Sequence, residues 1–490
     1  MKQKIIPIKK SQWFGLTFTS LKQMLPRSIG FSFFKAWQWL TIFGVLLNER
    51  YNVNAFGAYI GEFYPLTHML ATVVLFVLLG IILPMKSLPL SAHRSIYVAA
   101  ALLAGVGTIV ATQSSGLLLL VIMGPILTGF GEALIVLMCG EYCSSIGIRQ
   151  TGLFLLMSYL LAVGLFFIVV SVPETIIPFL MSFYPIIAVV SLLSNKKAVV
   201  YYGKAVAKTA ERRVLPVIKH SELWKIFLSL AVLSFSVNFA RYSMESIGLM
   251  PLRNYPILMA AHATAAVLAF VGALLSKKKN APVITVNLVI LIVAIGIALI
   301  PFIDSSQGFF VSFILTSGKT YLVIVSWIIF ASITHSLRIP SIKVFGWGSA
   351  LTIGGNFLGA FVGSFVVSAI FTNETPLMAI TLVNMILLIA SAAFLSNGYT
   401  TVQKLGVSMQ TSGLVMRPLD IIAQKYALTP REKEITALLV QGRSLPHIEK
   451  ELNISHGTAN THVHNIYQKV GVRFRQELLD VFQSFEHELR

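Results

Sequence analysis

Three polar side chains near the end of the chain, Asn460, Thr461 and His464, are of types that can read nucleic-acid bases. Asn460 and His464 stand four residues apart, so a helix would place them on one face, with Thr461 beside them. An asparagine amide can pair with N6 and N7 of adenine in the major groove, and hydroxyl groups can contact either kind of base edge. Each residue taken singly is more often part of an ordinary solvated helix face. The interpretation therefore depends on the elements that present them.

Four short helices are predicted around these residues. Thr429 as N-cap and Glu432 three residues later form a capping box at the start of the first helix, and Gly442 ends it. Ser455 caps the third helix, whose apolar spacing turns the three polar residues outward. Two helices joined by a short turn, with a polar face on the second, form a helix-turn-helix. The first helix starts at Pro430, and the others are expected near 446–452, 458–470 and 476–485.

The segment LTPREKEITALLVQGRSLPHIEKELNISHGTANTHVHNIYQKVGVRFR, from Leu428 to Arg475, resembles the LuxR-type helix-turn-helix domain over its full length without gaps. The resemblance implies a bacterial regulator that binds double-stranded promoter DNA. It assigns base contacts to Asn460, Thr461 and His464, and phosphate contacts to Thr458, Lys469 and Arg473. The positions shared with the family include Leu428, Thr429, Arg431, Glu432, Gly442, Ile448, Ser455, Thr458, His462, Asn465, Ile466, Lys469, Gly471 and Arg475.

Two features of this segment are expected to lower its affinity for DNA. Asn460 stands where the family usually has a DNA-contacting lysine, and residues 426–490 are neutral, with eight basic and eight acidic side chains. Few phosphate charges are then neutralised, so sequence-independent affinity is expected to be low. Tight binding would need a homodimer on two half-sites. In this family the fourth helix commonly supplies the dimer contact, which makes Leu478, Leu479 and Phe482 candidates.

The residues before this segment are too hydrophobic for a soluble domain. Of the whole chain, 56% is hydrophobic and 12% is charged, whereas about 25% is charged in soluble domains. A helix needs roughly 20 apolar residues to span a bilayer. The prediction is an all-α chain, a polytopic twelve-helix membrane bundle followed by the four-helix domain. The twelve spans are expected at 28–48, 65–84, 94–113, 116–140, 151–170, 175–194, 223–247, 255–276, 282–303, 310–335, 345–371 and 376–396.

The formal net charge of +19 lies entirely before Tyr426 and is explained by membrane topology. Loops rich in Lys and Arg alternate with loops poor in them, and the basic loops face the cytoplasm. Both termini are then cytoplasmic, and the expected location is the inner membrane of a bacterial cell. Residues 1–27 are basic and lack a short apolar core with a cleavage site, so a cytoplasmic tail is expected rather than a cleavable signal.

The spans divide into halves at 28–195 and 223–396, separated by a basic cytoplasmic loop at 196–222. Short stretches recur between the halves, as expected for a duplicated transporter fold. The arrangement resembles the major facilitator superfamily, which implies two six-helix bundles around a cavity lined by spans one, four, seven and ten. The loop after span two keeps the family's Gly80 and Arg94 but has no aspartate. Since the resemblance assigns that aspartate to contacts between transport states, its loss counts against active transport.

Glu132 and Lys319 lie within predicted spans four and ten, where a lone charge costs several kcal/mol. They occupy similar contexts in the two halves, so they are predicted to face each other across the cavity and to bind a small-molecule effector. A structural salt bridge, or a Lys319 that reaches the membrane surface, are the alternatives. Trp37 and Gln38 in span one and Asn238 in span seven are further candidates, although an interfacial role is commoner for tryptophan.

Two more patterns concern the spans. Arg241 could guard the cavity entrance beside Asn238, or it could pair with Glu245 one turn along the helix. Five glycines in span eleven predict close packing between helices. They are Gly346, Gly354, Gly355, Gly359 and Gly363.

Residues 397–425 are expected to be a linker to the DNA-binding domain at 426–490. No soluble input module fits in that linker, so residues 28–396 are expected to be the sensor. The leading hypothesis is a membrane-anchored one-component transcriptional regulator in which a small molecule in the cavity controls DNA binding. The alternative is a secondary transporter with a regulatory DNA-binding tail. The sequence holds no nucleophile–base set, metal-ligand spacing or phosphate loop, so neither an enzyme, a metal site nor a cofactor is predicted.

Overall fold

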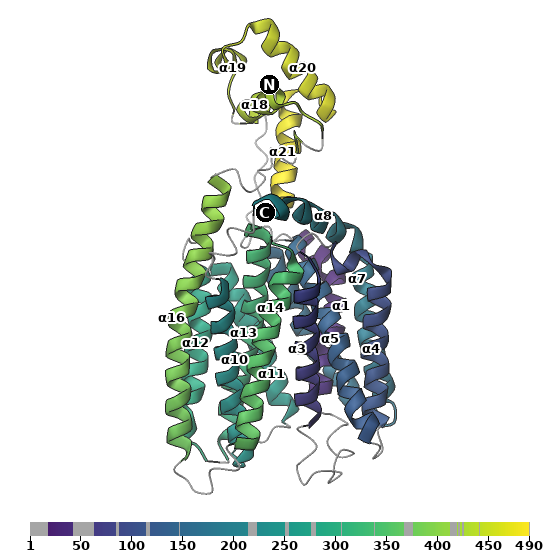
Figure 1. Cartoon of the computed structure of the whole chain (residues 1–490), viewed down its shortest axis with the longest axis vertical. Coiled ribbons are helices and arrows are strands. Elements are labelled where there is room, and N and C mark those ends of the chain that lie inside the picture. The colour runs from purple at the N-terminus through teal and green to yellow at the C-terminus, as the bar shows by residue number, and fades with distance from the viewer. Residues whose placement is uncertain are drawn as a thin grey trace, which may run out of the picture. The chain divides into compact units, whose positions relative to one another are not determined.

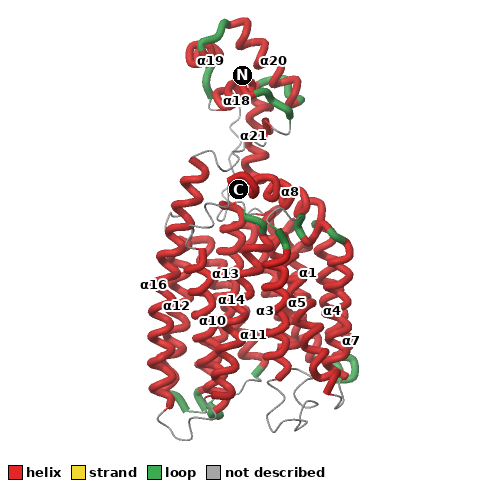
Figure 2. The backbone as a smooth tube through the Cα atoms, viewed as in Figure 1, coloured by secondary structure: helices red, strands yellow, loops and turns green. Residues whose placement is uncertain are grey.

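Every regular element that the structure describes is a helix, and no strand occurs among these residues (Figure 2). The structure is a computed structural model, and the chain divides into two compact units, Met1–Val402 and Gln403–Arg490. The residues described are 18–42, 63–84, 88–113, 118–146, 148–213, 223–249, 254–275, 281–304, 306–337, 339–366, 376–411, 419, 422–423, 426–440 and 442–489.

Twelve long helices of the described chain run side by side as a bundle in the first unit (Figure 1). Each corresponds to one of the twelve predicted spans, so the predicted all-α bundle is confirmed. The helices are α1 (Phe18–Ile42), α3 (Phe63–Ile82), α4 (Arg94–Gln113), α5 (Leu118–Ile146), α6 (Ile148–Val170), α7 (Ile177–Ser194), α10 (Leu223–Ser246), α11 (Tyr255–Leu275), α12 (Ala281–Leu299), α13 (Gly308–Leu337), α14 (Ser341–Phe361) and α16 (Pro376–Thr411).

The composition of these helices suits a bilayer. Eight helices of the described residues are long and apolar enough to cross a membrane, and α11 and α12 contain shorter apolar stretches. Large side chains such as Leu102, Phe183 and Ile389 remain exposed on the bundle. An apolar surface of this extent is stable against lipid and unfavourable in water. The chain is therefore a multi-pass membrane protein.

Three of the span-eleven glycines explain how tightly α14 packs on α10. Gly355, Gly359 and Gly363 repeat every fourth residue, and a Cβ at any of them would overlap a backbone carbonyl group of α10. Small residues at this spacing let two helix backbones approach closely. Gly354 faces open space instead. The packing prediction thus holds for three of the five glycines, while Gly346 meets no atom nearer than 3.7 Å.

The two halves contact each other toward both ends of the bundle. Lys343 Nζ on α14 donates to the carbonyl oxygen of Gly80 on α3 over 2.6 Å. Toward the other end, the Phe166 ring of α6 lies 5.6 Å from the Tyr255 ring of α11, centroid to centroid. The halves are thus in contact through two different pairs of helices.

A carboxylate from span four holds the loop that follows span two. Glu141, near the end of α5, accepts hydrogen bonds from the backbone N–H groups of Leu90 (2.6 Å) and Ser91 (2.9 Å) and from the Ser91 hydroxyl (2.6 Å). Leu90 begins a short 3-10 turn, η2 (Leu90–Ala92), which packs beside α8 (Lys196–Arg213). Most of the predicted basic loop at 196–222 is therefore helical. The acidic residue that binds the loop between spans two and three, Glu141, comes from the helix of span four.

The predicted linker also begins as a helix. α16 continues to Thr411, past the predicted span end at 396. No proline occurs between Pro376 and Pro418, so the covalent chain has no residue that obliges the helix to stop. Polarity marks where the apolar span ends, but it does not by itself end a helix.

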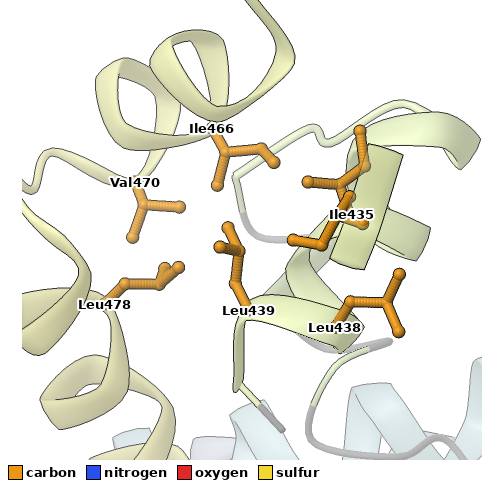
Figure 3. Close-up of a cluster of buried hydrophobic side chains, with 7 residues drawn as sticks. Ile435, Leu438, Leu439, Ile466, Val470 and Leu478 are labelled. Atoms are coloured by element: carbon orange, nitrogen blue, oxygen red, sulfur yellow. The ribbon is translucent and has the colours of Figure 1, made fainter. Parts of the chain in front are cut away.

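The second unit contains α18 (Pro430–Val440), α19 (Leu445–Leu452), α20 (His456–Val470) and α21 (Arg475–Leu489), which match the four predicted helices. The Thr429 N–H donates to Glu432 Oε2 over 2.7 Å and the Glu432 N–H donates to Thr429 Oγ1 over 3.3 Å, which confirms the capping box. Each large apolar side chain buried in the core stabilises the fold by about 1.5–3 kcal/mol. The core residues are Ile435, Leu438, Leu439, Ile448, Ile466, Val470 and Leu478 (Figure 3).

Candidate functional site

A cavity lies within the first unit, between its two six-helix halves. It is lined from α1, α3, α5 and α6 on one side and from α10, α11, α13 and α14 on the other. The lining includes the four spans expected from the resemblance, namely α1, α5, α10 and α13. The centres of water-sized molecules can occupy about 140 Å³ of this space. That is room for on the order of ten waters or one small metabolite.

The first half contributes a chain of hydrogen bonds around Glu132, which is buried on α5. Gln38 Nε2 donates to Glu132 Oε1 over 2.5 Å, and His68 Nε2 hydrogen-bonds to Glu132 Oε2. Lys35 Nζ donates in turn to Gln38 Oε1 over 2.7 Å. The other ring nitrogen of His68 lies 2.9 Å from Thr128 Oγ1. Both carboxylate oxygens of Glu132 therefore have partners from its own half.

The second half contributes two cations. Lys319 Nζ on α13 donates to Asn238 Oδ1 over 2.9 Å, and the Asn238 amide also hydrogen-bonds to Asn356 on α14. Arg241 lies one turn beyond Asn238 on α10, lines the cavity and is 4% exposed. Its buried Nε has no hydrogen-bond partner among the described residues. Glu245, the predicted partner one turn along α10, attracts Arg241 electrostatically, although no hydrogen bond is formed between the two side chains.

Aromatic rings border the charged groups. Trp39 stacks on His262 with ring centroids 4.2 Å apart and an angle of 14° between the planes. Tyr159 and Trp327 also line the cavity, and the Lys35 ammonium lies 5.4 Å and 5.9 Å from their ring centroids. Ring faces attract cations and offer flat apolar contact to a ligand. The cavity thus combines charge with flat apolar walls.

The structure brings most of the predicted effector residues together, in a different pairing. Glu132, Lys319 and Gln38 line one cavity. Glu132 and Lys319 do not pair with each other, because Glu132 is held by Gln38 and His68 while Lys319 is held by Asn238. Asn238 itself is fully buried behind the lining and positions Lys319.

Trp37 lies away from the cavity. Its side chain is fully buried, and its indole Nε1 donates to Thr108 Oγ1 on α4 over 2.8 Å. Successive side chains point about 100° apart around a helix, so Trp39 faces the cavity from the same helix while Trp37 faces α4. The second tryptophan of the pair is the cavity residue.

Four ionisable residues that line the cavity or bind a loop were not predicted from the sequence. Lys35, His68 and His262 line the cavity but were not among the expected effector residues. Glu141 falls one residue beyond the predicted end of span four, whereas α5 continues to Ile146. The signal that finds all four is an ionisable residue within or just beside a predicted span.

The second unit presents a polar face on α20. Ser455 caps this helix by accepting a hydrogen bond from the Thr458 N–H over 3.2 Å, and Ala459, Ile466 and Val470 point into the core. Opposite this buried side, the predicted base-reading residues are exposed, namely Asn460, Thr461 and His464. The helix-turn-helix arrangement and its outward polar face agree with the prediction.

Two arginines near α20 stabilise the fold of the domain by hydrogen-bonding to the ends of neighbouring helices. Arg431 Nη2 donates to the Leu452 carbonyl oxygen over 2.7 Å at the end of α19. Arg475 donates to the Leu439 carbonyl oxygen from both Nε (3.2 Å) and Nη2 (3.0 Å) near the end of α18. Cations here satisfy the last carbonyl groups of a helix. These side chains tie the four helices together.

Lys469, a predicted phosphate contact, is paired within the domain. Its Nζ lies 2.6 Å from Glu432 Oε2. Burial alone would raise the pKa of Glu432, but the Lys469 ammonium and the hydrogen bonds from Thr429 hold that pKa below its ordinary value. Of the other predicted phosphate contacts, Thr458 and Arg473 are exposed. The phosphate-binding prediction therefore rests on those two residues.

Leu478 is unavailable to a partner copy. It is 1% exposed and packs in the domain's own core (Figure 3). Leu479 and Phe482, the other two predicted dimer residues, are partly exposed.

Comparison with known proteins agrees with the geometry of the second unit. Residues 426–482 match the family described as bacterial regulatory proteins, luxR family. The spore germination protein GerE of Bacillus subtilis (strain 168) is 41% identical over 66 residues, which are 13% of this chain and 89% of GerE. The HTH-type transcriptional regulator MalT of Yersinia pestis (strain Pestoides F) is 41% identical over 56 residues, 11% of this chain. The chain spans only 6% of the length of that MalT.

The helical bundle is similar to solved transporters. A bacterial homologue of the iron transporter ferroportin, in an outward-facing state with soaked iron, has a TM-score of 0.54 at 12% identity, covering 78% of this chain and 100% of that one. The proton:xylose symporter XylE of the major facilitator superfamily has a TM-score of 0.49 at 10% identity, covering 77% and 95%. Identities this low show the fold alone. The protein is thus a multi-pass membrane protein in which a helical bundle with a transporter-like fold is joined to a helix-turn-helix DNA-binding domain. Through that domain the chain belongs to the LuxR family of bacterial regulatory proteins.

Proposed function

We propose that the protein is a membrane-anchored one-component transcriptional regulator. A small molecule in the cavity of the 28–396 domain controls DNA binding by the helix-turn-helix at 426–490, through the connector at 397–425. The membrane is the bacterial inner membrane, and both termini are cytoplasmic, where the DNA lies. No catalytic step is assigned to the chain.

The observation that carries this proposal is one chain holding both a GerE-like DNA-binding domain and a cavity with buried charges. Groups from both halves line the cavity, so a bound molecule contacts elements that move relative to each other in a transporter-like fold. A ligand shifts such an equilibrium only by its difference in affinity for the two states. The charged groups on each side of the cavity supply such a difference whenever the halves change their separation.

The reading face supports regulation through pairing. Asn460 and Thr461 are exposed and uncharged, His464 is exposed beside them, and Lys469 is paired with Glu432. One copy therefore neutralises few phosphates and binds weakly. Two copies joined through Leu479 and Phe482 would read two half-sites, and pairing is the step that the sensor controls.

Promoter occupancy by the full-length protein in its native membrane tests the proposal. Chromatin immunoprecipitation should recover discrete promoter fragments, and transcription of the adjacent genes should change when the chain is deleted. The double variant Asn460→Ala with His464→Ala should lose this occupancy, whereas Gln476→Ala, on α21, should keep it. Unchanged occupancy in the double variant would show that the base contacts are wrong.

A secondary transporter with a regulatory DNA-binding tail is the alternative, favoured by the transporter-like fold and by a cavity that both halves line. Among the described residues, no three His, Cys, Asp or Glu side chains are grouped as metal ligands, so iron is not carried over from the ferroportin homologue. Proteoliposome uptake of radiolabelled organic acids and sugars separates the two functions. Uptake well above that of a Glu132→Gln control would identify a transporter.

A further inference from the structure

Charge is distributed unequally between the two walls of the cavity. The wall from the first half holds Lys35 and Glu132, which offset each other. The wall from the second half holds Arg241 and Lys319, and no Asp or Glu of the described residues lines the cavity on that side. Glu132 is the lone acidic lining residue among those described, and its oxygens are bonded to Gln38 and His68. The lining of the second wall is therefore positively charged, and the acid that acts on Arg241, Glu245, is not among the lining residues.

The buried guanidinium of Arg241 makes the difference in charge between the two walls energetically important. A guanidinium stays protonated in proteins, so burial cannot neutralise it. A buried charge without a partner is strongly unfavourable, and inside a membrane domain such residues pair or face a pathway. Arg241 is 4% exposed, and its Nε has no hydrogen-bond partner among the described residues, although the side chain lines the cavity. Glu245 attracts it electrostatically without a hydrogen bond, so the donors of the guanidinium are available to an anion in the cavity.

The position of Lys319 adds a second donor at the same place. Lys319 Nζ is bonded to Asn238, a neutral acceptor, and Asn238 lies three residues before Arg241 on one face of α10. The Lys319 ammonium, which comes from α13, and the Arg241 guanidinium, which comes from α10, therefore lie at the same stretch of α10. Arginine's planar fork matches a carboxylate through two parallel hydrogen bonds, and a neighbouring ammonium adds a point charge.

Aromatic rings from both halves suit the rest of such a molecule. Trp39 stacked on His262, together with Trp327 and Tyr159, gives flat apolar surfaces. The accessible space limits the occupant to a small metabolite. We infer that the effector is a small organic carboxylate whose acid group binds Arg241 and Lys319 and whose apolar body lies against these rings. This inference rests on the proposed function, because it names the ligand class of the same sensor.

Binding by the full-length protein in nanodiscs of zwitterionic lipid tests the inference without DNA. The probes are benzoate, its neutral isostere benzamide, and inorganic phosphate, with tryptophan fluorescence and the Tm as readouts. Benzoate should change the fluorescence and raise the Tm, and benzamide should do neither. Arg241→Gln should weaken benzoate binding about tenfold to hundredfold, as expected for loss of a hydrogen bond to a charged group. Arg94→Gln, an exposed arginine on α4 outside the cavity, should bind benzoate like the unmodified protein.

A second variant distinguishes a loss of benzoate binding from misfolding of the protein. Arg241→Lys keeps the charge without the fork, so its benzoate affinity should lie between those of the unmodified protein and Arg241→Gln. The ligand-free Tm of Arg241→Gln should equal or exceed that of the unmodified protein, because a buried charge is removed. Equal binding of benzamide and benzoate, binding of phosphate alone, or no binding of any probe would each overturn the inference. None of these outcomes touches promoter occupancy, which tests the proposed function separately.

Discussion

The two functional regions treat electric charge in opposite ways. In the membrane unit, the buried Arg241 has an Nε without a hydrogen-bond partner, and Lys319 is hydrogen-bonded to the neutral side chain of Asn238. In the DNA-binding unit, Lys469 and Glu432 pair inside the fold, while the reading face is polar and nearly uncharged. In the membrane unit, the cavity cations would gain an ionic partner when an anionic molecule binds. In the DNA-binding unit, the charges are already paired within one copy. Because its reading face carries little charge, its affinity for DNA is expected to depend on the pairing of two copies.

The largest loss of stability is expected from Leu478→Ala. This variant tests whether Leu478 belongs to the core of a single DNA-binding unit. Leu478 is a core side chain, so its truncation should cost about 3 to 4 kcal/mol of that unit's stability. Hydrogen exchange of α18 and α20 peptides in the full-length protein measures the loss. Leu479→Ala, one residue along, should preserve amide protection and instead weaken DNA binding. If both variants lost protection equally, Leu479 would belong to the core and not to a dimer contact.

Glu132→Gln probes the compensated wall of the cavity. An amide in place of the carboxylate cannot accept from both Gln38 and His68 without turning a donor toward one of them. The membrane unit should lose about 2 to 3 kcal/mol, the range for breaking a buried hydrogen bond to a charged group. Thermal unfolding followed by tryptophan fluorescence measures this, with the exposed Glu174→Gln as a control expected to change little. A Tm unchanged by Glu132→Gln would mean that the carboxylate is not the organising acceptor.

Asn460→Ala tests the reading face. Removing a base-pairing amide should cost about 2 kcal/mol, roughly thirtyfold in affinity for a recovered promoter fragment, and should relax specificity at one base pair. A mobility-shift assay with the full-length protein gives the affinity. A uniform loss across unrelated sequences, with specificity intact, would instead assign Asn460 to the phosphate backbone.

The smallest effect concerns the internal pair of the DNA-binding unit. Glu432→Gln should reduce its stability by about 1 to 2 kcal/mol, because the partner Lys469 is partly exposed. The pKa of Glu432 is lower in the folded state than its ordinary value of 4.5. The pair therefore contributes fully at neutral pH, and its contribution declines as the pH falls below about 4.5 toward the folded-state pKa. Hydrogen exchange should show this decline in the unmodified protein and not in Glu432→Gln. The exposed Glu434→Gln should change stability by less than about 0.5 kcal/mol.

Much of the fold follows from local sequence. Apolar length placed all twelve membrane helices, and capping residues such as Thr429 and Ser455 placed the helices of the second unit within a few residues. Periodicity also separated the buried and exposed sides of α20. These features depend on neighbours within one or two turns, which a sequence displays directly.

The site was only partly predictable, because it depends on which side chains meet across helices. An intramembrane charge marked Glu132 and Lys319 as cavity residues, but nothing in the sequence shows that His68 and Gln38 take both oxygens of Glu132. The sequence likewise does not show which of Trp37 and Trp39 faces the cavity, since a two-residue step decides which neighbouring helix a side chain meets. Glu141 was missed because the predicted span ends at residue 140, whereas α5 continues to Ile146.

The most direct test of the central claim is the affinity of the full-length protein for a recovered promoter fragment, measured in nanodiscs with and without saturating benzoate. If the cavity controls the reading face, benzoate should change that affinity at least about fivefold, the lower range of coupling between sites. Arg94→Gln should respond in the same way, and Arg241→Gln should lose the response at the same benzoate concentration. An affinity that stays constant while benzoate demonstrably occupies the cavity would contradict the account.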